Sequence, residues 1–171
     1  MLESVTFWVH LMAAAVWIGP QVLLPLAALP ALRTLEPSLR KRALAVLTAR
    51  YGYASWAALA VLVVTGVGNT FQVRSDTFGG DFGAMFDARY GLILGIKLAL
   101  VAATLLLTAW HAFVLGPRVL ALVDAPPEDQ ARAAGLRRLS VAVSTVNLAI
   151  GVVILYLVTL LQNGEFSLRP L

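Results

Sequence analysis

Four long apolar runs decide what this chain can fold into. They cover about residues 5–32, 51–72, 90–115 and 139–161. Each has the roughly 20 residues that a helix needs to cross the hydrocarbon of a bilayer. Hydrophobic residues make up 60% of the chain and charged residues only 13%, and the short connections leave no room for a soluble domain. We therefore predict an all-α fold, a single integral membrane bundle of four helices formed by residues 1–171.

The first apolar run resembles a signal peptide only in its position. It extends for about 28 residues, longer than the apolar part of a cleaved signal, and Glu3 stands where such signals carry basic residues. We expect it to be retained as a membrane span. The chain has no cysteine, which excludes disulfides, thiolate metal ligands and thiol catalysis.

The basic residues are concentrated in two of the three loops. The first and third loops carry Arg33, Arg40, Lys41, Arg42, Arg118, Arg132, Arg137 and Arg138. In the second loop, three aspartates outnumber the two arginines: Asp76, Asp81 and Asp87 against Arg74 and Arg89. The positive-inside rule then places both termini outside, N-out and C-out, in the cytoplasmic membrane. The net charge of +4 thus reflects membrane topology and does not indicate a nucleic-acid partner.

Lys97 is the one lysine or arginine well inside an apolar run, and no carboxylate lies within these runs. At 1.5 Å per residue it lies about 10 Å below Tyr90, and His10 lies about 8 Å below Val5. The two side chains therefore share a depth in the outer leaflet. A buried ammonium without a counter-ion is costly. Three outcomes fit: Lys97 pairs with an aspartate of the second loop, acts as a neutral amine ligand, or binds an anionic cofactor. The alternative is a side chain that snorkels outward to the interface.

A haem would satisfy both residues of this outer pair. Its iron accepts an imidazole and its propionates pair with a cation. Copper is the competing cargo, but copper(I) prefers methionine, cysteine and histidine ligands. Of the three methionines, Met12 points roughly 160° away from His10 on the same helix.

Polar residues also form helical stripes in three of the four runs. At 100° per residue, each of the following sets falls on one helix face: His10, Trp17 and Gln21; Lys97, Thr104, Thr108 and His111; Ser140, Ser144, Asn147 and Gly151. Polar side chains in lipid turn toward the bundle interior, so we expect the stripes to face one another. His111 lies about 21 Å deeper than Lys97, so the two histidines cannot hold one ion. We expect His111, Asn147 and Gln21 to form a second, inner site that serves as a polar site, a quinone-headgroup site or a proton relay.

Two segments carry a family resemblance. "WVHLMAAAVWIGPQVLLPLAAL" and "GLILGIKLALVAATLLLTAWHAFVLGPRV" resemble the copper-resistance protein D (CopD) membrane domain and, more distantly, the HemJ-type protoporphyrinogen oxidases. The shared pattern is a histidine seven residues before a tryptophan and fifteen before a proline, here His10, Trp17 and Pro25, with a later K-L-x-L-V helix that begins at Lys97. The HemJ resemblance implies haem b held with help from His10 and Lys97. The CopD resemblance implies copper handling at the cytoplasmic membrane.

The leading hypothesis from the sequence is a haem b protein acting in electron transfer or porphyrin oxidation, and it leaves enzymatic activity open. His10 would be an axial ligand, and Lys97 a propionate partner or the second ligand. Pocket walls would come from Trp17, Asn69 and Tyr156. The alternative is copper transport or copper resistance, with copper in place of haem, and a third reading is a structural subunit of a membrane complex. The expected partners of the protein are the lipid bilayer and a quinone or membrane redox protein. A second copy of the chain could also bind and bring two His111 residues together.

Overall fold

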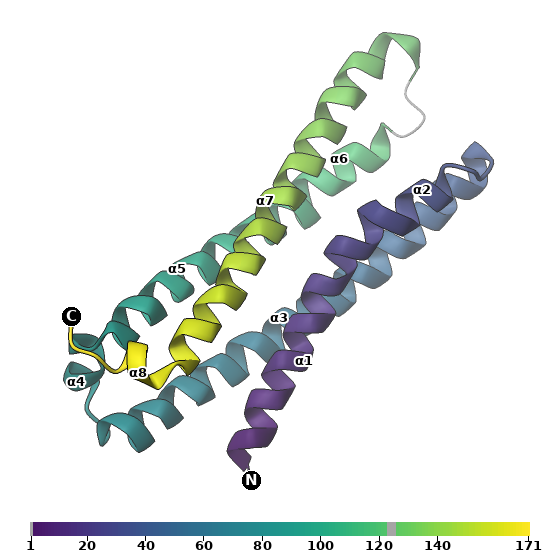
Figure 1. The fold of residues 1–171 in the computed structure, drawn as a ribbon. Coiled ribbons are helices and arrows are strands. Elements are labelled where there is room, and N and C mark those ends of the chain that lie inside the picture. The colour runs from purple at the N-terminus through teal and green to yellow at the C-terminus, as the bar shows by residue number, and fades with distance from the viewer. Residues whose placement is uncertain (1, 123–125) are drawn as a thin grey trace.

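Two long helical hairpins form the structure, a computed structural model that describes residues 2–122 and 126–171. Figure 1 shows the hairpins side by side, parted at the end that holds α2 and α6, and α1 of the first contacts α7 of the second. The first hairpin consists of α1 (Leu2–Leu23), η1 (Leu24–Ala28), α2 (Leu29–Leu32) and α3 (Pro37–Phe78). The second consists of α5 (Arg89–Trp110), η2 (His111–Leu115), α6 (Gly116–Ala121), η3 (Pro127–Asp129) and α7 (Gln130–Gln162). Two short helices, α4 (Phe82–Asp87) and α8 (Gly164–Ser167), lie near the C-terminus.

The predicted all-α fold with four membrane-spanning helices is confirmed. Four continuous helical stretches in the described residues are long and apolar enough to cross a membrane: Ser4–Leu32, Pro37–Phe78, Arg89–Ala121 and Pro127–Gln162. The second and fourth begin well before the predicted apolar runs at residues 51 and 139. Arginine, lysine, leucine and alanine dominate these extensions, and all four are strong helix formers, so the helices continue past the apolar segments.

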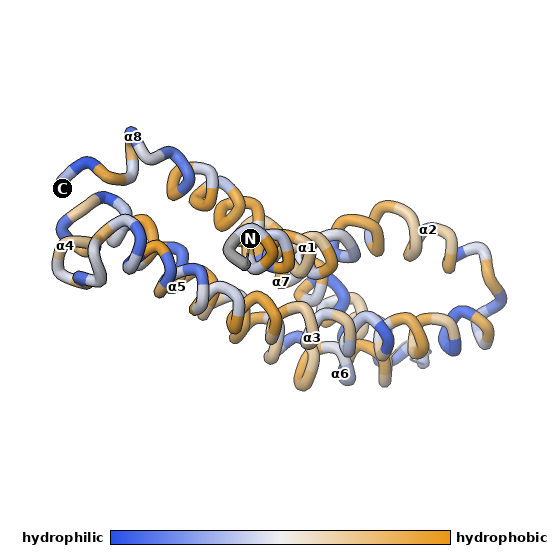
Figure 2. Tube along the Cα trace, turned by 90° about the horizontal axis from the view of Figure 1, so that it is seen from below, coloured by the Kyte–Doolittle hydropathy of each residue, from blue (hydrophilic) through white to orange (hydrophobic). Residues whose placement is uncertain are grey.

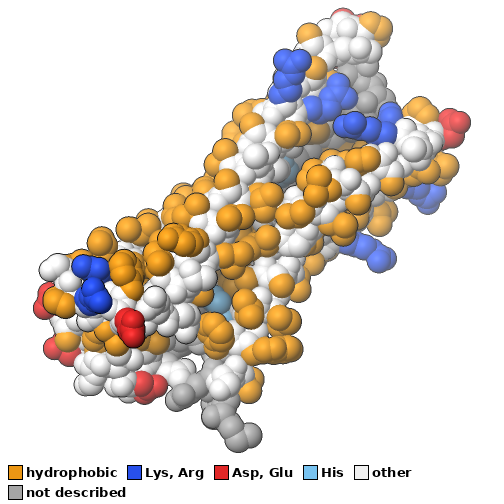
Figure 3. Space-filling model, in the orientation of Figure 1, with side chains coloured by type: hydrophobic (Ala, Val, Ile, Leu, Met, Phe, Trp, Pro, Cys, Tyr) orange, Lys and Arg blue, Asp and Glu red, His pale blue; other side chains and the backbone are white. Residues whose placement is uncertain are grey.

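Charge is distributed unevenly between the two ends of the molecule. The bends of the two hairpins, at α2 and α6, lie at one end of the molecule, and the start of α1, α4 and α8 lie at the other (Figure 1). Figure 2 shows hydrophobic residues along the helices and hydrophilic stretches toward both ends. In Figure 3 lysine and arginine atoms gather at the α2–α6 end, while most of the visible acidic atoms lie at the other. We call these the basic end and the acidic end.

Both hairpins contain a π-helical turn toward the basic end. Pro25 lies within η1 and Pro117 directly follows Gly116 at the end of η2. Proline lacks the N–H group of a regular helical bond, and a π-turn accommodates the missing donor with a wider ring. In η2 the N–H of Gly116 bonds the carbonyl of His111. A Cβ at Gly116 would lie 3.0 Å from that oxygen, so the turn that begins at His111 favours glycine.

At the acidic end, the α4 segment connects the hairpins and the C-terminal tail packs beside it. Helix α3 ends at Gly79 and Gly80, both with positive φ, whose N–H groups bond the carbonyl of Arg74. The Asp81 carboxylate then caps α4 by accepting from Gly83 N at 2.7 Å. The C-terminal tail forms an isolated antiparallel bridge between Ala88 and Pro170. A hydrophobic cluster around Met85, which is 1% exposed, supports these connections.

Candidate functional site

The His10 imidazole is fixed by a hydrogen bond across the first hairpin. Its Nδ1 lies 2.7 Å from Thr65 Oγ1 on α3. The Thr65 hydroxyl donates its one hydrogen to the carbonyl of Val61 at 2.6 Å, so toward His10 this oxygen is the acceptor and Nδ1 carries the proton. A neutral imidazole has one protonated nitrogen. His10 Nε2 is therefore left with a free lone pair, the arrangement of a metal-ligating histidine.

Gly66 lies against this ring, and Lys97 is on a helix of the other hairpin. A Cβ at Gly66 would come within 3.3 Å of His10 Cε1, so the absent side chain lets the imidazole lie against the α3 backbone. Lys97 is half-buried on α5. That His10 and Lys97 share a depth stays a prediction.

The predicted pocket walls occupy three different settings. Trp17 is 4% exposed and packs on Gly151, where a Cβ would lie 3.3 Å from the indole. Asn69 is half-buried on α3, one helical turn beyond Thr65. Tyr156 is 62% exposed on α7. Trp17 thus belongs to the helix interface in the middle of the bundle, and the assignment of all three residues to a cofactor pocket stays a prediction.

The three residues predicted for an inner site lie in one polar layer. Asn147 Nδ2 on α7 donates to Gln21 Oε1 of α1 and to Thr108 Oγ1 of α5, both at 3.4 Å. Gln21 Nε2 in turn donates to the carbonyl of Trp17 at 3.2 Å. One turn further, His111 Nε2 lies 2.9 Å from Ser140 Oγ and 3.5 Å from Ser144 Oγ. We call this set, with Thr104, the inner polar layer.

Two atoms of the inner polar layer have no partner. Thr104 Oγ1 and Asn147 Oδ1 are buried without a hydrogen bond among the described residues, and their side chains are 2% and 9% exposed. An unpaired polar group costs about 1–3 kcal/mol when buried. Thr104 lies on the same face of α5 as Lys97 and Thr108, one turn above Thr108. The polar stripe therefore joins the outer and inner levels through Thr104.

The side chains that could bind a ligand are isolated from one another and lie at two depths of the bundle. His10 and Gln21 are eleven residues apart on α1, as are Lys97 and Thr108 on α5, which separates the levels by roughly 16 Å. The described residues contain no group of three or more histidine or acidic side chains placed to hold a metal ion. This geometry suits weak, successive contacts with a small ligand or a single axial ligand to a cofactor.

Sequence reasoning missed Thr65, the residue that orients His10. Several other threonines bond only to carbonyls of their own helix, among them Thr48, Thr70 and Thr145. Thr65 makes the same local bond and also accepts from His10. The one sequence signal was its place beside Gly66, where a missing side chain permits close helix contact.

Comparison with known proteins identifies one family. The sequence profile of the family described as copper resistance protein D matches residues 45–161, more than half of the chain. Lys97, His111 and Asn147 lie within the matched range, while His10 and Gln21 precede it. No curated protein and no solved structure matches the chain significantly.

Proposed function

The chain belongs to the copper resistance protein D family, and on that premise we propose that it passes copper ions through the cytoplasmic membrane. It is a multi-pass membrane protein related to copper resistance. In the proposed pathway, copper is the cargo and His10 its first ligand, in the half of the bundle nearer the acidic end. The inner polar layer would receive the ion next, and His111 would be its last contact.

The free Nε2 of His10 is the observation that carries this proposal. Imidazole nitrogen is a good ligand for copper, and the His10–Thr65 bond at 2.7 Å presents it in the correct tautomer. Thr65 is held by its own bond to Val61. Copper therefore does not have to displace a proton from the ring or reorient it.

Lys97 links copper binding at this site to a proton. An ammonium beside His10 repels a copper cation strongly in a medium of low dielectric constant. Copper binding at His10 thus requires Lys97 to be a neutral amine, and each ion that binds displaces one proton from Lys97 to solvent. We expect copper affinity to rise with pH and to lose most of this dependence in Lys97→Met.

The weakness of the donor set favours transport over storage. An ion pathway needs sites that bind well enough to admit the ion and loosely enough to release it. One imidazole at the outer level, the unpaired Thr104 hydroxyl, and neutral amides and hydroxyls further in meet this condition. A storage site would need more soft ligands than the described residues bring together.

Copper flux into liposomes tests the proposal. Purified protein in liposomes loaded with a copper-sensitive dye should give a flux that His10→Ala reduces at least about tenfold, because losing even a partner that orients a metal-ligating histidine costs that much. Met12→Leu is the matched control, because Met12 is 39% exposed and lies on the same helix as His10 but on a different face. The proposal fails if the wild-type protein gives no flux above empty liposomes, or if His10→Ala transports normally.

Haem b binding is a second candidate, and Lys97 is the observation that favours it. An ammonium at the depth predicted for the His10 imidazole would match a ligand that carries both a metal and an acidic group. The residues fit such a group: His10 Nε2 would ligate the iron and Lys97 would pair with a propionate. Bound haem would supply one-electron redox chemistry, as electron transfer or porphyrin oxidation requires. In this role, Thr65 would orient His10 as the iron ligand, and the Lys97 ammonium would neutralise a propionate.

The two candidates predict opposite effects of one substitution. Replacing Lys97 with methionine removes a positive charge next to His10. It should strengthen copper binding at neutral pH but weaken haem retention. Oxidised and dithionite-reduced visible spectra of both proteins, with metal analysis, separate the cases. A Soret band that His10→Ala abolishes supports haem, and a colourless protein that binds copper supports transport.

A further inference from the structure

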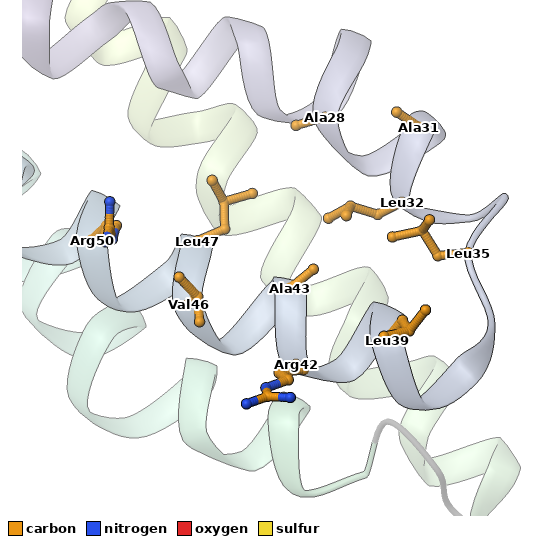
Figure 4. A pocket seen from close by; sticks show the side chains of 10 residues that line it. All are labelled: Ala28, Ala31, Leu32, Leu35, Leu39, Arg42, Ala43, Val46, Leu47 and Arg50. Atoms are coloured by element: carbon orange, nitrogen blue, oxygen red, sulfur yellow. The ribbon is translucent and has the colours of Figure 1, made fainter.

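A groove opens between the two arms of the first hairpin at the basic end. It lies between the η1–α2 segment and the first turns of α3 and has a volume of about 750 Å³. Figure 4 shows Leu32, Leu35 and Leu47 directed into the space between the two helices. Small side chains at Ala28 and Ala43 leave the space open on both sides. The groove is separate from the His10 level and from the inner polar layer.

Proline placement explains why the helices part here. The chain carries Pro20, Pro25 and Pro30 within one helical stretch. Each removes a backbone donor, and the resulting π-turn at Leu24–Ala28 redirects the helix axis. Helix α3 contains no proline after Pro37 and continues as one uninterrupted helix. The redirected arm and the uninterrupted arm therefore enclose a space that neither fills.

The lining combines an apolar surface with two arginines. All lining residues other than Arg42 and Arg50 are alanine, valine or leucine. The two arginines lie two turns apart on α3, about 12 Å along the helix. The adjoining turn adds Arg33, Arg40 and Lys41 against a single acid, Glu36. The groove thus offers hydrocarbon contact along its length and positive charge beside it.

We propose that this groove is a binding site for an anionic phospholipid, with an acyl chain along the leucines and the phosphate at Arg50. Arg42 adds positive charge from the side of α3 that is turned away from α2 (Figure 4). Arginine pairs with phosphate through two parallel hydrogen bonds. Basic pockets between membrane helices on the cytoplasmic side are the places where anionic headgroups bind. A zwitterionic lipid would fill the apolar part but would bring no net negative charge to Arg42 and Arg50. This inference concerns a different surface from the copper or haem site and does not depend on either.

Lipid retention and thermal shift of the purified protein test the site. We would compare phosphatidylglycerol with phosphatidylcholine by native mass spectrometry and by the unfolding temperature in detergent. The wild-type protein should retain phosphatidylglycerol selectively and be stabilised by it. Arg42→Gln with Arg50→Gln should weaken this binding about thirtyfold, from the contribution of two arginines near a lipid surface. Ala43→Trp should fill the groove and lower retention of both lipids while the arginines remain.

The double substitution Arg137→Gln with Arg138→Gln is the matched control. It removes the same charge from exposed positions on α7 at the same end, and we expect it to keep full lipid selectivity. The proposal is overturned if both double variants lose selectivity equally, since diffuse charge attraction would then suffice. It is also overturned if inorganic phosphate stabilises the protein as well as the lipid does, if Ala43→Trp retains the lipid, or if the groove variants dissociate a dimer.

Discussion

One hydroxyl group determines which nitrogen of His10 is available. Thr65 uses its hydrogen on Val61 and its lone pair on Nδ1, and the result is a ligand-ready Nε2. Without Thr65 the ring would have no fixed tautomer and would rotate more freely. Thr65 is therefore a positioning residue for the proposed site, acting through His10 and not on the ligand itself.

Thr65→Val should lower copper affinity by about 10–100-fold, the usual effect of removing a partner that orients a metal-ligating histidine. The change keeps the shape of the side chain and deletes its oxygen. Thr145→Val is the control, because Thr145 bonds only its own helix at the carbonyl of Val141. Nitrogen NMR of the His10 ring should show a tautomer mixture in Thr65→Val alone. Unchanged affinity together with an unchanged tautomer would contradict the positioning role.

Asn147 is the residue that connects three helices, and its removal should have a measurable but modest cost. Asn147→Leu has similar volume and removes the bonds to Gln21 and Thr108. Hydrogen bonds between membrane helices contribute about 0.6 kcal/mol on average and up to about 1.7, so we expect a loss of about 1 kcal/mol in the free energy of unfolding. Equilibrium unfolding in mixed micelles measures it, with Thr145→Val as the unaffected reference. A loss no larger than that of the reference would show that the layer does not stabilise the bundle.

Among the elements, the junction of α4 and α5 is packed very closely at Gly91. A Cβ on Gly91 would lie 2.6 Å from Phe86 Cα and 2.7 Å from the carbonyl oxygen of Met85. Both are backbone atoms and cannot rotate away. The turn of α4 onto α5 therefore depends on the missing side chain, and with it the contact of the C-terminal tail through Ala88.

Gly91→Ala should destabilise the protein by roughly 1–3 kcal/mol, the cost of an overpacked contact. Gly95→Ala, one turn further along α5, meets nothing within 4 Å and should be neutral or stabilising by up to about 1 kcal/mol, because alanine is the better helix former. Unfolding of both variants under the same conditions gives the comparison. If both shift the free energy of unfolding in the same direction, the close contact does not control this junction.

The elements also show what the sequence can and cannot predict. The stripes of Gln21, Thr108 and Asn147 were predicted to meet, and they do, because polar side chains in lipid have only the bundle interior to face. The partner of His10 was not predicted, since the local backbone bond of Thr65 is the same as that of other membrane threonines. The short helices α4 and α8 were also missed. They have six and four residues, with local caps from Asp81 and Asn163, and are too short to show a helical pattern in the sequence.

At the scale of the whole molecule, helix length and charge together suggest an orientation. Helix α3 has 42 residues, about 63 Å at 1.5 Å per residue, roughly twice the hydrocarbon thickness of a bilayer. Its two ends must therefore lie on opposite sides of the membrane. The end that begins at Pro37 carries the basic turn of the first hairpin, and the other end adjoins the aspartate-rich second loop. The positive-inside rule predicts that the first end faces the cytoplasm, which would give N-out and C-out termini.

Single cysteines at the two ends of α3 test this orientation directly, because the chain has no cysteine of its own. Ser38 and Ser75 are both exposed, and each substitution to cysteine is chemically the same. In intact spheroplasts, a membrane-impermeant maleimide should label Ser75→Cys and leave Ser38→Cys unlabelled, since only the first thiol would face outward. After permeabilisation, both should react at similar rates, which shows that local burial does not explain the difference. Labelling of Ser38→Cys alone in intact spheroplasts would reverse the orientation and, with it, the side from which copper reaches His10.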